Sequence, residues 1–539
     1  EYVQTLAMQG GLKLDTRAVE RVVLFLNGQY WGVYGMRERP VDHDYTKEYY
    51  DQDKYNLHYL STWGSTEAEY GGLAAFADWV SLRDFILQND MGDPVNYEIV
   101  KDQYQMLSLI DYMVVNLNCV ASDWLNYNTG WWRGLDPEGD HKKWGYILWD
   151  LDATFDYYIN YSGVPNTDPD AQPCDIEDIS DYMDEFFNEA PIDVIPNPEE
   201  CPTILNGNSP YPVTDSIFIQ VINADHYCCE TEWDNICQDA YDAISENPGG
   251  NVNPQGNVGK HEKIFLKLQE ESETFRQLYF SRQADLQNTV YTCENMLQTL
   301  DSMLAVIEPE MPRQIERWGG SMAEWEQNVQ DLIGFIEMRC ELMDEGMVDC
   351  YDLTGPYELT LKVEPMGAGE IELNTIDIEA FPWSGFYYGE MDNLIEAKPV
   401  DDELFVFSHW ESAAGNTIFP DVFDPEAKIQ LITQDTLTAV FTSLVKTDEL
   451  DQGISFSVFP NPATDQIVLN YELDEAMDIE VRLFSSIGEQ LILPGLPSGK
   501  KTAGKHTQII GLKGILPAGV YWLNFTSGEH RLTRKISVF

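Results

Sequence analysis

Residues 119–128 read CVASDWLNYN and residues 147–155 read ILWDLDATF, and these two stretches decide how the first part of the chain folds. The first follows the apolar segment 104–118, whose spacing predicts a helix buried on most sides. The second ends a predicted β-hairpin, in which WWRG (131–134) and WGYILW (144–149) flank a polar turn. The expected order is a buried helix, a polar loop, a hairpin and an acidic strand end.

The loop and the strand end carry the side chains that phosphoryl transfer requires. Asp123 and Asn128 lie five residues apart on the loop, and Asp150 and Asp152 come just after the second strand. Phosphoryl transfer needs a carboxylate to accept the hydroxyl proton, and amide and carboxylate oxygens to hold Mg²⁺ on the phosphates. Protein kinases present these groups in the same order along the chain. The alternative is structural, because this spacing arises often by chance in an acidic chain and both residue types cap loops.

The charge balance is extreme and excludes some classes of partner. The 539 residues include 32 Lys and Arg against 92 Asp and Glu, a net charge of -60. Such a surface repels phosphate backbones and anionic lipids, so we expect no nucleic-acid binding and no docking on a membrane surface. The sequence has no stretch of about 20 apolar residues, so we expect no membrane span. The acidity suits a soluble surface in a salty or extracellular medium; Ca²⁺ binding at acidic loops is the alternative.

The cysteines and the N-terminus indicate where the protein works. No zinc-like or thiol-chemistry spacing accompanies the cysteines, so their local density predicts disulfides and an oxidising compartment. The odd total leaves a free thiol, for which Cys119 in the apolar helix is the candidate. The chain opens EYVQTLAMQG without the pattern of a signal peptide, so we expect it to begin inside a longer precursor. Five of the nine cysteines fall within 64 residues: Cys174, Cys201, Cys228, Cys229 and Cys237.

The remainder of the first 350 residues divides into a hairpin, an insertion and a helical part. VVLFLNGQYWGVYGM (22–36) predicts two strands joined by a turn at Asn27-Gly28. Residues 162–256 are rich in Pro, Asp, Asn and Gly, which predicts a loop-rich insertion partly cross-linked by disulfides. Helical periodicity returns over 258–348 and is interrupted at Gly319-Gly320.

Short alternating strands follow the helical part. Residues 354–446 predict an all-β module of sandwich type, and 447–454 a linker. Residues 455–539 predict a second, small β-domain with seven or eight strands. The expected fold class is therefore multidomain α+β, with a mixed domain over 1–350 and two all-β sandwich-type domains after it.

Several long motifs resemble those of the CotH family of atypical, kinase-like proteins. They are FLNGQYWGVYGMRERPVDHDY (25–45), SDWLNYNTGWWR (122–133), KWGYILWDLDATFD (143–156), and EMPRQIERW (310–318) with LIGFIEMR (332–339). The resemblance spans about 1–350, with 162–256 as an insertion. It implies a kinase-like fold that uses ATP and Mg²⁺ to phosphorylate Ser or Thr hydroxyls of a protein.

Carried over by position, the resemblance assigns roles to the loop and strand-end residues. Asp123 would be the catalytic carboxylate, and Asn128 a ligand of the metal or of a phosphate, with Asn126 as its rival. Asp150 and Asp152 would hold Mg²⁺, and Asp150 is the more direct ligand because it leaves the strand first.

The resemblance also bears on the nucleotide site. Glu38 matches a family acidic position and would orient a phosphate-binding base; an ion pair with Arg37 or Arg39 is the alternative. Family members carry an upstream RGNSS-like motif and a Lys that would contact the nucleotide phosphates. This chain begins after that segment, with Lys13 and Arg17 ahead of the first strand, so we expect a kinase-like domain that is incomplete at its N-terminus.

The last domain resembles the type A C-terminal sorting domain of type IX secretion. FPNP (459–462) and PAGVYWL (517–523) carry that resemblance. It implies export through the periplasm and across the outer membrane, with translocon or shuttle proteins as partners. The basic residues Arg531, Arg534 and Lys535 are candidates for that contact, and a charge-balanced edge strand is the alternative.

The sequence as a whole favours a secreted or cell-surface CotH-like protein kinase. Its main rival is a non-catalytic surface protein that keeps the fold for binding or adhesion, because ATP is scarce outside cells.

Overall fold

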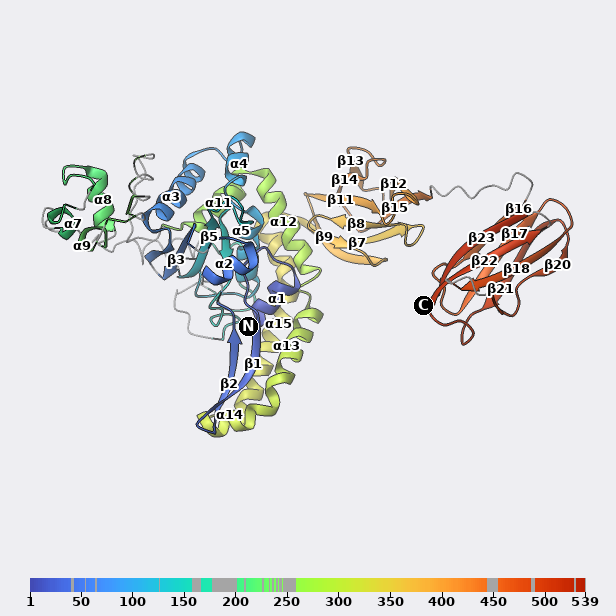
Figure 1. The fold of residues 1–539 in the computed structure, drawn as a ribbon, viewed down its shortest axis with the longest axis horizontal. Helices are drawn as coiled ribbons and strands as arrows, with labels where there is room; N and C mark the ends of the chain where they lie inside the picture. The colour runs from blue at the N-terminus through green and yellow to red at the C-terminus, as the bar shows by residue number, and fades with distance from the viewer. Residues whose placement is uncertain are drawn as a thin grey trace. The chain divides into compact units, whose positions relative to one another are not determined.

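The chain folds into two compact units, each described here by itself (Figure 1). One consists of Glu1–Val400 with Phe407–Phe441, and the other of Asp401–Val406 with Thr442–Phe539. The first is mixed α and β and the second is built of strands, so the fold is multidomain α+β, as expected. The computed structural model describes residues 1–39, 43–53, 55–63, 65–125, 127–157, 166–176, 201–207, 210–224, 227–231, 233–234, 237–238, 241, 245, 258–443, 454–485, 490–527 and 530–538.

The described helices lie in the first 351 residues, together with six strands. In chain order the elements are α1 (Tyr2–Gln9), β1 (Val19–Leu26), β2 (Gln29–Arg37), α2 (His43–Tyr50), β3 (Leu57–Trp63), β4 (Ser65–Tyr70), α3 (Gly72–Gln88), α4 (Pro94–Lys101), α5 (Met106–Asn118), β5 (Tyr127–Gly134), β6 (Gly145–Ile147), α7 (Pro202–Leu205), α8 (Ser216–Ala224), α9 (Tyr227–Glu230), α11 (His261–Glu271), α12 (Glu273–Gln287), α13 (Cys293–Ile307), α14 (Met311–Trp318) and α15 (Met322–Tyr351).

The two predicted hairpins are both present. β1 and β2 form an antiparallel pair in which Leu26 lies opposite Gln29. Asn27 and Gly28 between them have φ angles of 51° and 78°, the left-handed values that a two-residue hairpin turn requires. The second hairpin, β5 with β6, belongs to an antiparallel sheet of order β4-β3-β5-β6.

The buried helix predicted over 104–118 is α5, and nearly all of its residues are buried. Its deepest polar contact is an ion pair with α12. The guanidinium of Arg282 donates to both carboxylate oxygens of Asp111, at 2.6 and 3.0 Å, and both side chains are at most 5% exposed. Since the Arg282 Nη1 group also donates to Thr375 Oγ1 at 2.9 Å, this one side chain joins α5 and α12 to the β-sandwich that follows.

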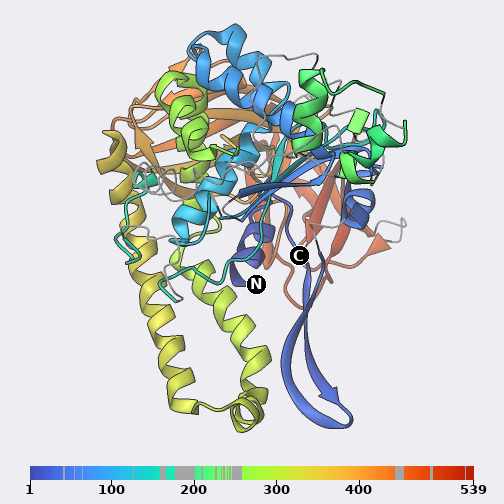
Figure 2. The same cartoon turned by 90° about the vertical axis from the view of Figure 1, so that its left-hand side faces the viewer.

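α13, α14 and α15 form the long arm seen beside the β1–β2 hairpin in Figure 2. The expected break between two amphipathic helices is confirmed, because α14 ends at Trp318 and Gly319 and Gly320 both have positive φ. The side chain of Ser321 then caps α15 by accepting a hydrogen bond from the Glu324 N–H at 3.2 Å. A disulfide between Cys293 and Cys340 links α13 to α15.

The sandwich predicted over 354–446 shares the first compact unit with the helices. Buried Asp285 of α12 accepts hydrogen bonds from the backbone N–H of Thr375 at 2.8 Å and from the hydroxyl of Tyr387 at 3.0 Å. Its sheets have the orders β10-β7-β15-β12 and β13-β14-β11-β8-β9. The strands are β7 (Thr354–Glu364), β8 (Gly369–Leu373), β9 (Ile376–Ile378), β10 (Trp383–Gly389), β11 (Asp392–Pro399), β12 (Phe405–Ser412), β13 (Thr417–Phe419), β14 (Glu426–Gln430) and β15 (Asp435–Ser443).

All five cysteines predicted to form disulfides do so. Cys201 pairs with Cys229, and Cys228 with Cys237, inside the predicted insertion. Cys174 pairs far away along the sequence, with Cys350 at the end of α15. Cys119 is the free thiol, as expected, and burial raises its pKa to about 12.

The last domain is a two-sheet sandwich, and its described residues form eight strands. One sheet has the order β16-β17-β21, and the other has the order β19-β18-β22-β23, with β20 also paired to β18. The core contains Leu469, Leu483 and Phe525, each without exposed surface. The strands are β16 (Ile454–Phe459), β17 (Gln466–Leu473), β18 (Met477–Ser485), β19 (Gln490–Leu491), β20 (Ser498–Lys501), β21 (Gly504–Gly511), β22 (Gly519–Ser527) and β23 (His530–Val538).

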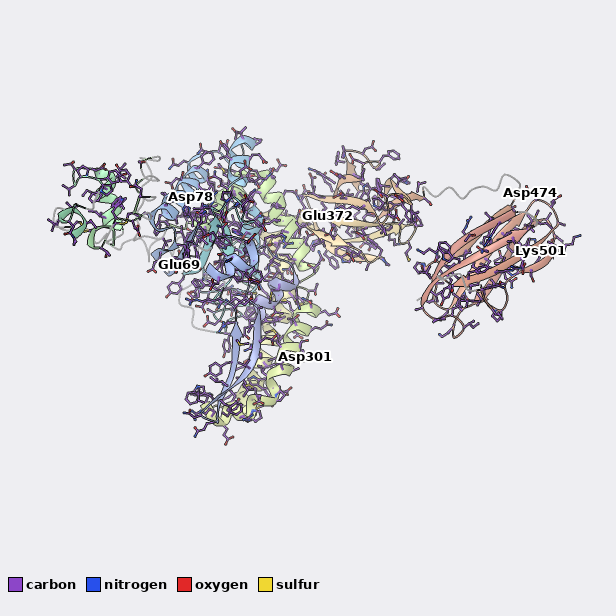
Figure 3. The ribbon with its side chains drawn as sticks, in the orientation of Figure 1. Glu69, Asp78, Asp301, Glu372, Asp474 and Lys501 are labelled. Atoms are coloured by element: carbon purple, nitrogen blue, oxygen red, sulfur yellow. A yellow bond between two sulfur atoms is a disulfide. The ribbon has the colours of Figure 1, made fainter. Side chains whose placement is uncertain are left out.

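Acidic side chains such as Glu69 and Asp301, labelled in Figure 3, are exposed on the first unit, consistent with the strongly negative charge of the chain. In the part of the chain that the structure describes, no helix is both long and apolar enough to cross a membrane.

We predict that Arg282→Met destabilises the first unit by about 3–5 kcal/mol, because it leaves the Asp111 carboxylate buried without its partner. The measurement is chemical denaturation followed by tryptophan fluorescence. Lys101→Met is the matched control, since it removes an exposed ion pair with Glu98 and should change little. Equal midpoints for the two variants would show that the pair contributes nothing to stability.

Candidate active site

The loop that carries Asp123 begins where α5 ends, and Arg339 of α15 fixes that end. Its guanidinium donates to the carbonyl oxygens of Leu117 at 2.8 Å and Asn118 at 3.3 Å. These carbonyls belong to the last turn of the helix, where intrahelical donors run out, and the Leu117 carbonyl also accepts from the Val120 N–H at 3.3 Å. Because Arg339 is only 3% exposed, the cap lies in the interior, and the loop starts from a fixed point.

Within this loop, Asn128 holds Asp123. The Asn128 amide donates from Nδ2 to Asp123 Oδ2 at 2.9 Å and, more weakly, to the Asp123 carbonyl oxygen at 3.3 Å. The Trp149 indole N–H donates in turn to the Asn128 carbonyl oxygen. Asn128 has a φ of 50° and Leu125 a φ of 71°. Both residues are therefore held in the left-handed backbone conformation, which costs free energy for residues other than glycine. Such backbone strain is concentrated at functional sites.

The strand end that carries Asp150 is bonded directly to this loop. The Ser122 N–H donates to the Ala153 carbonyl oxygen and the Phe155 N–H to the Cys119 carbonyl oxygen, each at 2.9 Å. Asp150 itself has a φ of 51°. Residues 119–128 and residues 147–155 therefore lie side by side.

Asp123, Asn128 and Asp150 line a single small cavity of about 10 Å³. Its other walls come from the two loops and from Tyr112 and Asn116 of α5. Three of the four side chains predicted for phosphoryl transfer are thus brought together. The fourth, Asp152, is exposed and lines a neighbouring cleft.

Arginines converge on the other side of Asp150. Arg17 and Arg37 line one cavity with Asp150, and Arg21 and Arg37 line a wider cleft of about 390 Å³ with Asp150 and Asp152. The base of the β1–β2 hairpin supplies Arg21 and Arg37. The far wall of the wider cleft is apolar and comes from α13, through Leu300, Met303, Leu304 and Ile307. One cleft therefore joins a cationic end, an apolar wall and three carboxylates, those of Asp150, Asp152 and Glu1, and Glu1 forms an ion pair with Arg21.

The charges around Asp150 act on its pKa in opposite directions. Partial burial and the neighbouring Asp152 carboxylate raise the pKa of Asp150 above its ordinary value, while the positive charges of Arg17 and Arg37 lower it. The net direction is upward. Binding a cation at this carboxylate would remove the repulsion that raises its pKa.

The donor set fits a hard divalent cation. Asn128 Oδ1 is buried and has no hydrogen-bond partner among the described residues. A buried amide oxygen without a donor is free to coordinate a metal ion. With the Asp150 and Asp152 carboxylates it would offer the oxygen ligands that Mg²⁺ prefers. No cluster of three or more His, Cys, Asp or Glu side chains able to hold a metal occurs in the described part of the chain, so the amide is needed to complete this set.

Glu38 lies beside the hairpin base and accepts two hydrogen bonds. Its Oε2 accepts from the Ala18 N–H at 2.9 Å, and its Oε1 from the Tyr49 hydroxyl at 2.6 Å. These contacts tie the end of β2 to the approach of β1 and to α2, so Glu38 braces the segment that presents Arg37. Asn126, the rival of Asn128, lies outside the described residues.

Sequence reasoning missed the arginines of this site. Arg37 lies within the motif 25–45 and Arg17 precedes the first strand, but neither the motif nor the sequence around Arg17 and Arg21 indicates a contact with Asp150, and only the fold brings the hairpin base against the 150–152 turn. Arg339 ends the LIGFIEMR motif and could have been suspected as functional, but its role as a helix cap depends on the position of α15.

Comparison with known proteins matches both parts of the chain. The family model described as CotH kinase protein matches residues 5–191 and 228–343, which leaves 192–227, within the predicted insertion, unmatched. The model described as Secretion system C-terminal sorting domain matches residues 457–538, and such a tail directs export to the cell surface or beyond it. No curated protein matches the chain. Because the first match covers more than half of the 539 residues, the chain belongs to the CotH kinase protein family.

Proposed function

We propose that this exported protein is a Mg²⁺-dependent protein kinase, which transfers the γ-phosphoryl group of ATP to a Ser or Thr hydroxyl of another protein. The observation that carries the proposal is the cavity lined by Asp123, Asn128 and Asp150, with arginines on the far side of Asp150. These groups come from separate segments, and together they meet the needs of phosphoryl transfer: a base, oxygen ligands and cations for the phosphates.

Asp123 is the proton acceptor. Its Oδ2 is oriented by the Asn128 amide, and its backbone leaves the fixed end of α5. As the acceptor hydroxyl oxygen forms its bond to the γ-phosphorus, the bond from that phosphorus to the leaving ADP oxygen breaks, and the hydroxyl proton passes to the Asp123 carboxylate.

Asp150, Asp152 and Asn128 Oδ1 would hold Mg²⁺ on the phosphates. When bound, the metal neutralises charge on the phosphate oxygens and aligns them for transfer. Arg17, Arg21 and Arg37 bind phosphate oxygens by charge-assisted hydrogen bonds. The apolar wall from α13 suits a nucleotide base, and the cleft volume of about 390 Å³ is within the range of small-molecule sites.

We propose a separate contact surface for the export machinery on the sorting domain. Arg531 and Lys535 lie four positions apart on one exposed face of β23, and Lys535 lies opposite Trp522 of β22, which is 39% exposed. Arg534 points to the opposite face and donates to the Phe456 carbonyl oxygen of β16 at 3.1 Å. Of the three basic residues singled out in the sequence, Arg531 and Lys535 therefore form the contact and Arg534 joins the two sheets.

We predict that Asp123→Asn and Asp150→Asn both strongly reduce phosphate transfer but differ in nucleotide binding. Asp123→Asn lowers kcat by about 10²–10⁴-fold because no base accepts the proton, and it leaves Mg²⁺-ATP binding intact. Asp150→Asn loses binding as well, because a metal ligand is removed. Isothermal titration with Mg²⁺-ATP and transfer of labelled phosphate to dephosphorylated casein measure the two effects.

The matched control is Asp136→Asn, on the turn between β5 and β6, which should change neither quantity. If the wild-type chain binds no Mg²⁺-ATP and transfers no phosphate, the kinase proposal fails and the non-catalytic binding protein is the better account.

We predict that the pH dependence of Mg²⁺ binding reports on Arg37. A raised pKa means that Asp150 takes up a proton at a higher pH than an ordinary Asp, so binding weakens earlier on acidification. Arg37→Gln removes a charge that lowers this pKa, so the midpoint of the loss moves to higher pH. It also weakens Mg²⁺-ATP binding roughly tenfold. The measurement is Mg²⁺ binding across pH 4–7, with Arg39→Gln as control. If Arg37→Gln and Arg39→Gln both kept the wild-type midpoint, Arg37 would have no influence on the protonation of Asp150.

We predict that Arg531→Glu/Lys535→Glu reduces the amount of protein at the cell surface severalfold, because reversed charge repels the partner of this face. The measurement compares the amount of this protein labelled on the surface of intact cells with the amount in the periplasmic fraction. Lys500→Glu/Lys501→Glu makes the same change in charge on β20 and should export normally. Normal export of both variants would remove the proposed contact.

A further inference from the structure

The segment 166–176 follows the 150–156 turn and packs beside the loop that carries Asp123. Its start is tied back by Thr167, whose hydroxyl donates to Asp156 Oδ1 at 2.7 Å. Its middle is held by Arg339, whose Nη1 donates to the carbonyl oxygens of Pro169, at 2.9 Å, and Ala171. The same guanidinium caps α5, so one side chain serves the segment and the catalytic loop together.

The end of the segment is fixed to α15 by a covalent bond. Cys174 forms a disulfide with Cys350, and the Tyr351 hydroxyl donates to the Pro173 carbonyl oxygen at 3.3 Å. Buried Pro173 packs against Gly346, where an added Cβ would come within 2.9 Å of the proline ring. The carboxyl end of α15 is thus shaped to receive this segment.

The segment also forms one wall of a cavity that adjoins the active site. Ala171, Gln172 and Asp175 line this cavity of about 30 Å³ together with Ala121 and Trp124 of the catalytic loop. Trp124 also lines the cavity of Asp123 and Asn128. Its indole nitrogen is buried without a hydrogen-bond partner among the described residues, so its position depends on packing alone. Loss of the segment would open the wall of this cavity beside Trp124.

The Cys174–Cys350 bond differs in exposure from the two disulfides of the insertion. Cys201, Cys228, Cys229 and Cys237 are each at most 3% exposed, whereas Cys174 and Cys350 are both partly exposed. An exposed disulfide exchanges with dithiols without unfolding of the protein around it. Cys119 does not compete for pairing, because it is fully buried.

We propose that closure of the Cys174–Cys350 disulfide switches on the active site by clamping the segment 166–176 against the catalytic loop, so that kinase activity is acquired only in an oxidising compartment. The inference rests on the proposed kinase function. In closure, the two thiols lose two protons and two electrons to the disulfide of a periplasmic thiol oxidoreductase, which becomes a dithiol. The closed loop spans 176 residues, and the entropy removed by a cross-link grows with loop length.

The test compares the full chain with Cys174→Ser/Cys350→Ser and, as matched control, Cys201→Ser/Cys229→Ser. Hydrogen exchange of amides 117–125 should be about tenfold faster in the first variant and unchanged in the control, because the clamp lowers the population of open loop. Transfer to dephosphorylated casein should fall by about the same factor in the first variant alone. Wild-type protein treated with mild dithiothreitol, with opened pairs identified by alkylation and mass spectrometry, should match the first variant without any substitution. Because Cys293–Cys340 is also partly exposed, the same treatment of Cys293→Ser/Cys340→Ser shows the effect of opening Cys174–Cys350 without it.

Unchanged exchange of 117–125 in the first variant and in the dithiothreitol-treated wild type would overturn the clamp. Wild-type protein that transfers no phosphate while its exchange still responds to the disulfide would refute the kinase function and leave the clamp standing. Full transfer by the first variant would refute the switch and leave the kinase function standing.

Discussion

The structure of the site depends on how the carboxyl end of α5 is satisfied. A helix leaves its last carbonyl groups without donors, and α5 is buried along almost its whole length, so water is not at hand to supply them. Backbone N–H groups just past the helix donate to the carbonyls of Val115, Asn116 and Leu117, and Arg339 of α15 adds donors to those of Leu117 and Asn118. The cost of burying its charge is offset by four carbonyl oxygens, two from α5 and two from the 169–171 turn. A lysine could not replace it, because a point charge on a flexible stem lacks the fixed fork that reaches both chains.

A second set of buried polar contacts fixes the β-sandwich to α5 and α12. Arg282 and Asp285 are less than one turn apart on α12; the first binds α5 and the second binds the turn after β8. Both also engage Thr375. The sandwich is therefore not a loosely tethered module, because its nearest turn shares hydrogen bonds with the helix pair that supports the Asp123 loop. Buried polar networks of this kind favour one arrangement, since any other leaves charged groups unpaired.

Sequence alone predicted the features that depend on local chemistry. The Asn27-Gly28 turn, the buried helix, the break at Gly319-Gly320 and the free thiol at Cys119 each follow from a few neighbouring residues, and all are present. Sequence alone also predicted that Asp123, Asn128 and Asp150 belong to one site, and they line one cavity. Their chemical roles stay predictions. The arginines at the hairpin base were missed because their meeting with Asp150 is a property of the tertiary fold. The Cys174–Cys350 pairing was missed for the same reason, as its partners are 176 residues apart. The opposite orientations of Arg534 and Lys535, in contrast, follow from strand alternation and were available from the sequence.

The Cys174–Cys350 disulfide also determines what happens when the backbone is cut. Every peptide bond between Cys174 and Cys350 lies inside a covalent ring, and that ring contains both the cysteine-rich insertion and the helical arm. A protease that cuts there divides the backbone but releases no piece, so the part with the Asp123 loop stays joined to the helix that caps it. Outside the cell, where proteases are present and no ribosome can replace a damaged copy, a nicked molecule of this protein would remain one molecule.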